Sequence, residues 1–271
     1  MRPASLTLLA LLATGASAQE APRPIVVQST TSTANSGLYD HLLPPFTDAT
    51  GIEVRVVAVG TGQAIRNAMN CDGDVLLVHA REDEEAFVAE GHGTSRTDVM
   101  YNDFVLVGPS SDPALLRGRP DAAGALAAIA QAQAPFASRG DESGTHKREM
   151  ALWQDAGVDP ADGSGRWYRE MGAGMGATLN AASAMDAYAL TDRATWLTFG
   201  NRGDLAVLVE GDPALFNQYG VIPVSPDACP GVAREEALAF VDWLTGPEGQ
   251  ARIASYEVEG RPLFTPNAPG D

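Results

Sequence analysis

The sequence predicts an α/β fold of two lobes, and two observations lead to that prediction. First, short apolar segments are followed again and again by segments with helical spacing, which is typical of sheets covered by helices. Second, the apolar segments 104–109 and 219–224 can each carry the chain between lobes. We expect lobe one to be discontinuous (19–108 plus 220–271) and lobe two to be 109–219. The sheets are expected to be mixed but mainly parallel, with a ligand cleft between the lobes.

The first half of the chain alternates strand and helix. Short runs rich in β-branched residues predict strands at 25–28, 52–59, 74–79 and 104–107. Segments with helical spacing predict helices at 36–43, 61–70 and 82–90. The first helix is expected to break or kink at Pro44-Pro45, because a proline inside a helix removes a backbone hydrogen bond.

The second half begins with an alanine-rich segment, 121–134, that predicts a helix. The further strands are expected at 135–138, 205–209 and 219–224. The further helices are expected at 148–156, 167–171, 177–184, 234–244 and 248–256.

The N-terminal 18 residues have the organisation of a secretory signal peptide. Met1-Arg2 is basic, Leu6 to Ala13 is largely apolar, and Ala16-Ser17-Ala18 fits a cleavage signal. We therefore expect cleavage after Ala18 and an exported protein. The formal net charge of −17 argues against a nucleic-acid partner, since no basic stripe is present to neutralise phosphates.

Two cysteines, Cys71 and Cys229, are present in the sequence. In an oxidising compartment two thiols are more often bridged than free, so they are a candidate disulfide, although the sequence alone leaves the bridge open. Neither cysteine has a nearby cysteine or histidine at ligand spacing, and no cation site or cofactor is expected.

The most informative segment is the run 138–146, SRGDESGTH. It places Arg139, Ser143, Gly144 and Thr145 directly before a segment with helical character. The first N–H groups of a helix lack internal partners and lie at the positive end of its dipole. Together with the guanidinium of Arg139, they predict a binding site for an anion.

Two further strand-to-helix loops are rich in hydrogen-bond donors. The first, 29–37, contains Thr30, Thr31 and Ser32, and the second contains Thr61 and Gly62. Helix capping explains one or two of these hydroxyls but not the whole set. Ligands of α/β folds bind at such loops, so we expect the three loops to converge on one oxyanion.

Arg193 is a further candidate, reaching the cleft from the second lobe. The alternative is that it forms an ion pair that braces a helix start, since Asp192 is adjacent. No loop offers a nucleophile beside a base, and Ser143 does not lie in a G-x-S-x-G motif. A hydrolase of anionic esters is therefore the weaker alternative to a binding protein.

Several segments resemble the tungstate-binding periplasmic proteins of ABC importers. They are TTSTANSGL (30–38), GTGQA (60–64), GDVLLVHA (73–80), YNDFVLVGP (101–109) and the 138–146 run. The resemblance implies a two-lobe Venus-flytrap fold (type II) that closes around tungstate, or molybdate, and delivers it to a permease with its ATPase. On matching positions, the ligand contacts would be Thr30 or Thr31, Thr61, Arg139 and Thr145, with Ser32 and Ser143 as neighbours.

The main alternative ligand is phosphate, because the pattern R-x-D-x-S-G-T (139–145) also resembles the anion loop of phosphate-binding periplasmic proteins. Phosphate keeps a proton near neutral pH and needs an acceptor in its site, whereas tungstate and molybdate need donors only. Asp141 could be that acceptor, or it could orient Arg139 by a charge-assisted pair. The sequence leaves both roles open.

Overall fold

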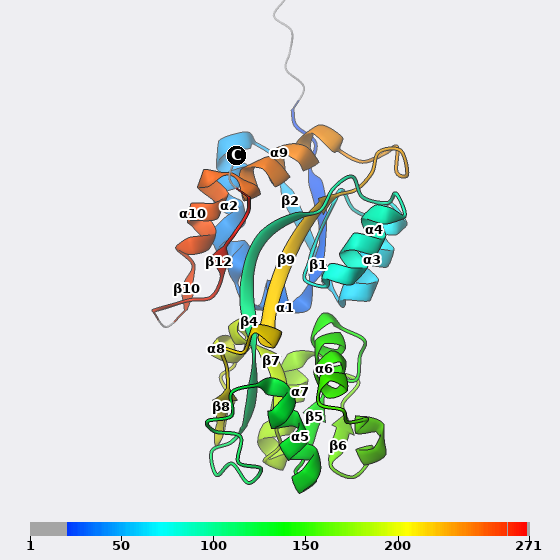
Figure 1. Ribbon diagram of the computed structural model, residues 1–271. Helices are drawn as coiled ribbons and strands as arrows, with labels where there is room; N and C mark the ends of the chain where they lie inside the picture. Colours follow the sequence, from blue (N-terminus) through cyan, green and yellow to red (C-terminus); the bar gives the residue numbers. More distant parts are fainter. Residues whose placement is uncertain (1–20, 259, 270–271) are drawn as a thin grey trace, which may run out of the picture.

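The longest strand, β4 (Thr97–Pro109), runs through both lobes of the computed structural model, which describes residues 21–258 and 260–269 (Figure 1). The predicted signal peptide lies outside the described residues. β4 pairs with β9 (Phe216–Pro223) as far as Asp103, and with β7 (Ala189–Asp192) from Phe104 onward. This exchange of partners within one strand is the basis on which we propose the two-lobe division, 19–108 plus 220–271 and 109–219.

The sheet of the upper lobe in Figure 1 has the strand order β12-β4-β9-β3-β1-β2. Its other strands are β1 (Ile25–Thr30), β2 (Val54–Val59), β3 (Val75–Val78) and β12 (Thr265–Pro266). β1 is parallel to β2 and β3, whereas β9 is antiparallel to β3 and β4. The expectation of mainly parallel pairing was therefore wrong. β4 leaves this lobe and β9 returns to it, so the two neighbours run in opposite directions.

The lower lobe adds β8 (Leu205–Val209), which also pairs with β4, and the parallel pair β5 (Phe136–Ser138) and β6 (Tyr168–Glu170). Its helices are α5 (Ala122–Ala132), α6 (Gly144–Asp155), α7 (Met175–Met185) and α8 (Arg193–Thr198), with short 3-10 turns at Pro160–Gly163 and Pro213–Leu215. A core of large side chains around Trp153, Phe136 and Tyr168 holds α6 against β5 and β6.

The helices of the upper lobe lie around its sheet in Figure 1. They are α1 (Thr31–Asn35), α2 (Leu38–Thr50), α3 (Thr61–Met69), α4 (Arg81–Ala89), α9 (Arg234–Thr245) and α10 (Pro247–Ala254). The small hairpin of β10 (Glu257–Val258) and β11 (Arg261–Pro262) follows α10. Within the described residues, no helix combines the length and the apolar character that crossing a membrane requires.

Two expected elements differ from the structure. α2 continues through Pro44 and Pro45 to Thr50, because it buries Leu38, Leu42 and Phe46 along one face, and that burial outweighs the hydrogen bonds lost at the prolines. The segment expected as a helix at 167–171 contains the strand β6, which is fixed by pairing with β5. Pairing between distant segments leaves no periodic signal in a short sequence window.

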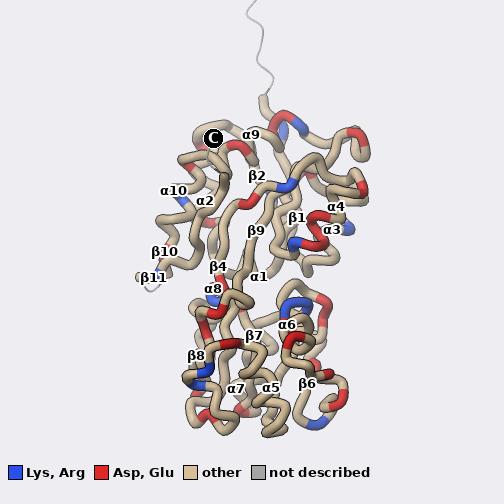
Figure 2. The backbone as a smooth tube through the Cα atoms, in the orientation of Figure 1, with Lys and Arg blue, Asp and Glu red and all other residues tan. Residues whose placement is uncertain are grey.

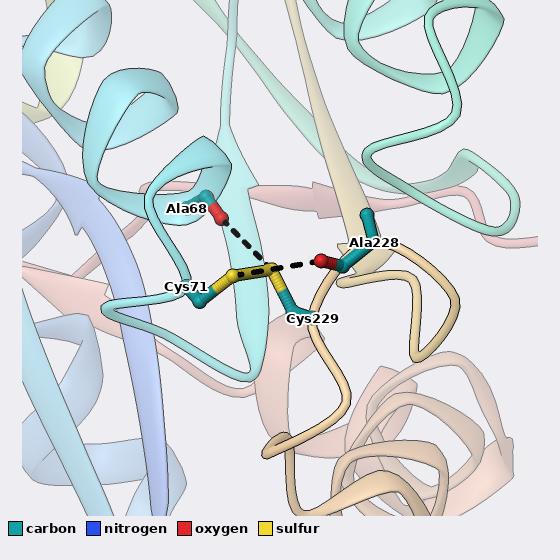
Figure 3. The surroundings of a disulfide bond; sticks show 4 residues. All are labelled: Ala68, Cys71, Ala228 and Cys229. Atoms are coloured by element: carbon teal, nitrogen blue, oxygen red, sulfur yellow. Dashed lines mark hydrogen bonds between the residues drawn. A yellow bond between two sulfur atoms is a disulfide. The ribbon is translucent and has the colours of Figure 1, made fainter.

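The structure has Cys71 and Cys229 joined as a disulfide, with a Cα–Cα distance of 5.4 Å (Figure 3). The bond connects the end of α3 to the segment that precedes α9. In Figure 3 the sulfur atoms lie near the backbone carbonyls of Ala68 and Ala228. The bridge therefore ties two parts of the upper lobe that are 158 residues apart.

Acidic residues are distributed over both lobes (Figure 2).

Candidate functional site

A small, tightly lined cavity lies where the two lobes meet. The loops after β1 and β2 reach it from the upper lobe, and the loop before α6 reaches it from the lower lobe. It is lined by Thr30, Thr31, Ser32, Val59, Gly60, Thr61, His79, Arg139, Ser143, Gly144 and Thr145. The structure thus brings eight of the ten predicted ligand-binding residues to one cavity. Gly62 lines the wider groove beside it, between α3, α4 and α6.

Thr30 ends β1 and caps α1, and its side-chain oxygen accepts a hydrogen bond from the Thr33 N–H. The same oxygen lies 3.1 Å from Ser32 Oγ and 2.7 Å from Thr33 Oγ1. These hydroxyls are almost completely buried. Capping alone accounts for one of them, and of the three, Thr30 and Ser32 line the cavity.

His79 lies at the end of β3 and belongs to this wall, which the sequence analysis did not predict. Its Nε2 is 3.3 Å from Thr30 Oγ1 and 3.2 Å from Ser32 Oγ, and its Nδ1 is 3.1 Å from Asn217 Oδ1. Burial, opposed by the bond to Asn217 and assisted by the charge of Arg139, lowers the pKa of His79 to about 4. The sequence did hold a signal for His79, which is a polar residue directly after a predicted strand. β3 is the neighbour of β1 in the sheet, and polar residues at the ends of such parallel strands lie at the same edge.

Arg139 supplies the positive charge of the lower lobe and is only 5% exposed. Its Nη2 and Nε donate to one oxygen of Asp141, at 2.5 and 3.2 Å. The other oxygen of Asp141 accepts from the Ser143 N–H at 3.2 Å. Burial disfavours ionisation of Asp141, but the hydrogen bonds from Ser143 and the charge of Arg139 outweigh it and lower its pKa. Asp141 does not line the cavity, so the geometry gives it the orienting role.

The lobes touch directly beside the cavity. The backbone N–H of Gly144, the first residue of α6, donates to Thr61 Oγ1 in the first turn of α3, at 3.3 Å. Farther out, Lys147 of α6 forms an ion pair with Asp83 of α4. A Cβ atom at Gly144 would lie 3.2 Å from His79 Cε1 and 3.3 Å from Thr61 Oγ1. The lobes can therefore approach this closely because residue 144 is a glycine.

Thr145 carries a free polar atom at the centre of this arrangement. Its side chain is 1% exposed and lines the cavity, and its Oγ1 has no hydrogen-bond partner among the described residues. Buried hydroxyls are rarely left without a partner, because the lost hydration is costly. A bound oxyanion would accept its hydrogen bond.

Arg193 does not line the cavity. Its guanidinium binds both carboxylate oxygens of Asp103, each at 2.6 Å, and Glu210 at 2.7 Å. These hydrogen bonds raise its pKa. The neighbouring Asp192 instead caps α8 through Thr195. Arg193 thus forms an ion pair, as the alternative in the sequence analysis expected. Its partner is Asp103 of β4 and not the adjacent Asp192.

Glu149 of α6 is a buried carboxyl group behind the 138–146 loop. Its Oε1 accepts from Tyr168 Oη at 2.8 Å and from Trp153 Nε1 at 3.2 Å. Tyr168 also reaches Ser138 Oγ, which accepts from the N–H of Gly140. Burial is the main cause that raises the pKa of Glu149 to about 7. The group connects the loop to the core of the lower lobe.

This pKa predicts a pH-dependent stability. The pKa of Glu149 in the folded chain (about 7) exceeds its ordinary value of 4.5. The protonated form of Glu149 therefore contributes to the stability of the fold fully below pH 4.5, and this contribution is lost as the pH rises through 7. Glu149→Gln keeps both accepted hydrogen bonds without the charge. We expect it to raise the free energy of unfolding at pH 8 by about 1–2 kcal/mol and to leave it little changed at pH 5. Urea unfolding at both pH values measures this, with the exposed Glu235→Gln as control. An equal effect of Glu149→Gln at both pH values would contradict the assignment.

The chain is similar to known proteins along most of its length. Residues 15–248 match the family described as a PBP superfamily domain. The chain is 47% identical to the tungstate-binding protein TupA of Peptoclostridium acidaminophilum, covering 97% of this chain and 96% of that one. It is 36% identical to TupA of Campylobacter jejuni, covering 88% of each.

Two solved structures are similar along most of the chain. The tungstate-binding protein TupA from Desulfovibrio alaskensis G20 has a TM-score of 0.82 and 47% identity, covering 92% of this chain and 100% of that one. The tungstate ABC transporter structure from Geobacter sulfurreducens has a TM-score of 0.79 and 48% identity, covering 86% and 98%.

Proposed function

The chain belongs to the tungstate-binding proteins of the PBP superfamily, and from that premise we propose that it holds tungstate in the cavity beside Arg139. It is the substrate-binding protein of a tungstate ABC transporter and not an enzyme. The predicted two-lobe α/β fold, the binding function and the family resemblance are confirmed by these relatives. The residues that bind the ligand are our proposal.

The observation that carries the proposal is the convergence of buried hydrogen-bond donors on one cavity. Thr145 Oγ1 is buried with no partner in the described part of the chain, Arg139 offers N–H groups beyond those bound to Asp141, and the N-termini of α3 and α6 lie on opposite sides of the cavity. A hydrogen bond to a charged group contributes roughly 1.5–3 kcal/mol. Nanomolar binding needs about 12 kcal/mol, so several donors must act together. We propose Thr30, Thr31, Ser32, Thr61, Arg139, Ser143, Gly144 and Thr145 as the ligand contacts.

The proton of phosphate is what separates the two candidate ligands. A protonated oxyanion is best matched by a carboxylate acceptor, but no Asp or Glu of the described residues lines the cavity, and both oxygens of Asp141 already accept from Arg139 and the Ser143 N–H. This supports tungstate over phosphate. Molybdate has the same charge and shape, and we propose that it binds in the same cavity.

We also propose the transport partners and the cellular location of the protein. Transport requires a permease with its ATPase, to which the loaded protein delivers its ligand. We propose export to the periplasm with cleavage after Ala18, and a monomeric mature protein.

A calorimetric and thermal-shift panel with sodium tungstate, molybdate, sulfate and phosphate tests the ligand. A ligand at a hundred times its Kd stabilises the folded state by about 2.7 kcal/mol. We expect large shifts of Tm with tungstate and molybdate and none with phosphate. A shift with phosphate in the absence of one with tungstate would reverse the assignment.

Lys147, the single lysine of the sequence, gives a direct measure of lobe closure. It is 47% exposed and joins the lobes through its ion pair with Asp83. We expect saturating tungstate to slow its reaction with an amine-directed reagent about threefold or more, because the ligand shifts the population toward the closed form. Mass spectrometry of the labelled peptide measures the rate, and Lys147→Arg identifies the background at the terminal amine. Equal rates with and without tungstate would show that this contact does not follow ligand binding.

A further inference from the structure

His79 presents a hydrogen-bond acceptor to a cavity that otherwise offers donors. Asn217 Nδ2 donates to Asn102 Oδ1 at 2.6 Å, so Asn217 Oδ1 is the atom turned toward His79. We therefore assign the neutral tautomer in which Nδ1–H donates to Asn217. Nε2 then carries a lone pair, which faces the hydroxyls of Thr30 and Ser32. One of these two hydroxyls must therefore donate its hydrogen bond to His79 Nε2 and not to a ligand.

The fixed charges around the cavity do not balance a dianion. Arg139 is the one arginine or lysine that lines the cavity among the described residues, and its charge is already paired with Asp141. Asp192, 1% exposed, is a second acidic group near Arg139; burial raises its pKa, and the charge of Arg139 opposes that shift. The termini of α3 and α6 contribute partial positive charges of roughly 0.5 each. A bound dianion would leave a net negative charge in a buried place, which is costly.

We propose, on the basis of the proposed function, that His79 takes up a proton from solvent when the oxyanion binds. The proton is added to Nε2, and the bond between His79 and the hydroxyl reverses direction. Nε2–H then donates to the hydroxyl oxygen, and the hydroxyl turns its own proton to the ligand. In the loaded protein, the hydroxyl then donates a hydrogen bond to the dianion together with the other donors of the cavity wall. His79 is thus a positioning residue that acts through Thr30 and Ser32.

The groups that face His79 are consistent with a proton that is absent from the free site and present in the loaded one. Arg139 opposes the positive charge on the imidazole, and a bound dianion would favour it by a larger Coulomb energy. Tyr219 packs against the ring at 4.7 Å between centroids and stays neutral, because burial raises its pKa. The adjacent cavity on the α4 side carries groups of both signs: Arg81, Glu82, Asp83, Lys147 and Arg148.

Isothermal titration calorimetry with sodium tungstate, in pairs of buffers with different ionisation enthalpies, counts the protons taken up. At pH 6 we expect uptake of a substantial fraction of one proton per tungstate. We also expect Kd to fall about 3- to 100-fold from pH 8 to pH 6, since one linked proton gives at most tenfold per pH unit. His79→Gln should abolish both effects, whereas His41→Gln, which changes a histidine remote from the cavity, should leave them as in the unmodified protein.

The outcomes separate this proposal from the proposed function. Failure of the unmodified protein to bind tungstate would overturn both. Binding with no proton uptake and with a constant Kd from pH 8 to pH 6 would overturn the role of His79 alone. Proton uptake that persists in His79→Gln would also overturn it, since another group such as Asp192 would then be the acceptor.

A spectroscopic measurement covers the case in which His79→Gln does not fold. The four histidines of the sequence give four ring Cε1–H signals, and the variants His41→Gln, His92→Gln and His146→Gln assign the remaining one to His79. At pH 6 we expect tungstate to move this signal to the position of a protonated imidazole. A signal that stays at the neutral position in the loaded protein would overturn the proposal.

Discussion

Arg139→Ala is expected to lower the affinity for tungstate by about a hundredfold or more. The guanidinium is buried at the cavity and held by Asp141, so it offers preoriented, charged donors to the ligand. Removing one partner of such a buried charged contact costs roughly 2–5 kcal/mol, and each 1.4 kcal/mol is about tenfold in Kd. Calorimetric titration with tungstate measures the loss. A Kd within threefold of the unmodified protein would remove Arg139 from the site.

Two matched variants show what Arg139 contributes. Arg139→Lys keeps the charge but loses the planar fork of donors, so we expect an intermediate loss. Asp141→Asn removes the orienting charge and leaves the guanidinium, so it should weaken binding less than Arg139→Ala does. If Asp141 instead faced the ligand, Asp141→Asn would strengthen the binding of a dianion by removing a repulsive charge. Thermal melts without ligand confirm that each variant is folded.

The three strand-to-helix loops that meet at the cavity could be predicted from sequence because their signals are local. Strand, hydroxyl or glycine, and helix follow one another within a few residues at Thr30, Thr61 and Ser143, and the same backbone geometry that makes these positions helix starts also points their N–H groups at one edge. The alternation of strands and helices likewise predicted the fold class. Both predictions rest on which residues follow one another within a short stretch of the sequence.

The features that were missed depend on partners far away in the sequence. His79 is hydrogen-bonded to Asn217, which is 138 residues away, and Arg193 is held by Asp103, which is 90 residues away. A sequence without an alignment does not show such pairs. The same holds for β6, which exists because β5 lies beside it, and for α2, whose prolines are tolerated because its apolar face is buried.

Gly144→Ala is expected to weaken tungstate binding while leaving the unloaded protein stable. The added methyl group would lie 3.2 Å from His79 Cε1 and 3.3 Å from Thr61 Oγ1, both in the opposite lobe, and contacts this tight oppose full closure of the lobes. Overpacking of this kind costs about 1–3 kcal/mol, which corresponds to a loss of roughly 5- to 150-fold in affinity. The penalty falls on the closed form only, because an open cleft has room for the methyl group.

Gly176→Ala is the matched control, since Gly176 also lies in the first turn of a lower-lobe helix, α7, but a Cβ there would meet no atom within 4 Å. Both variants place alanine where glycine reduces helix stability, so neither should lower the Tm of the unloaded protein. A change in Kd for Gly144→Ala but not for Gly176→Ala would locate the effect at the contact between lobes. Equal affinities in the two variants would mean that tungstate is held without the approach of α6 to Thr61 and His79, and that closure at this contact is not part of binding.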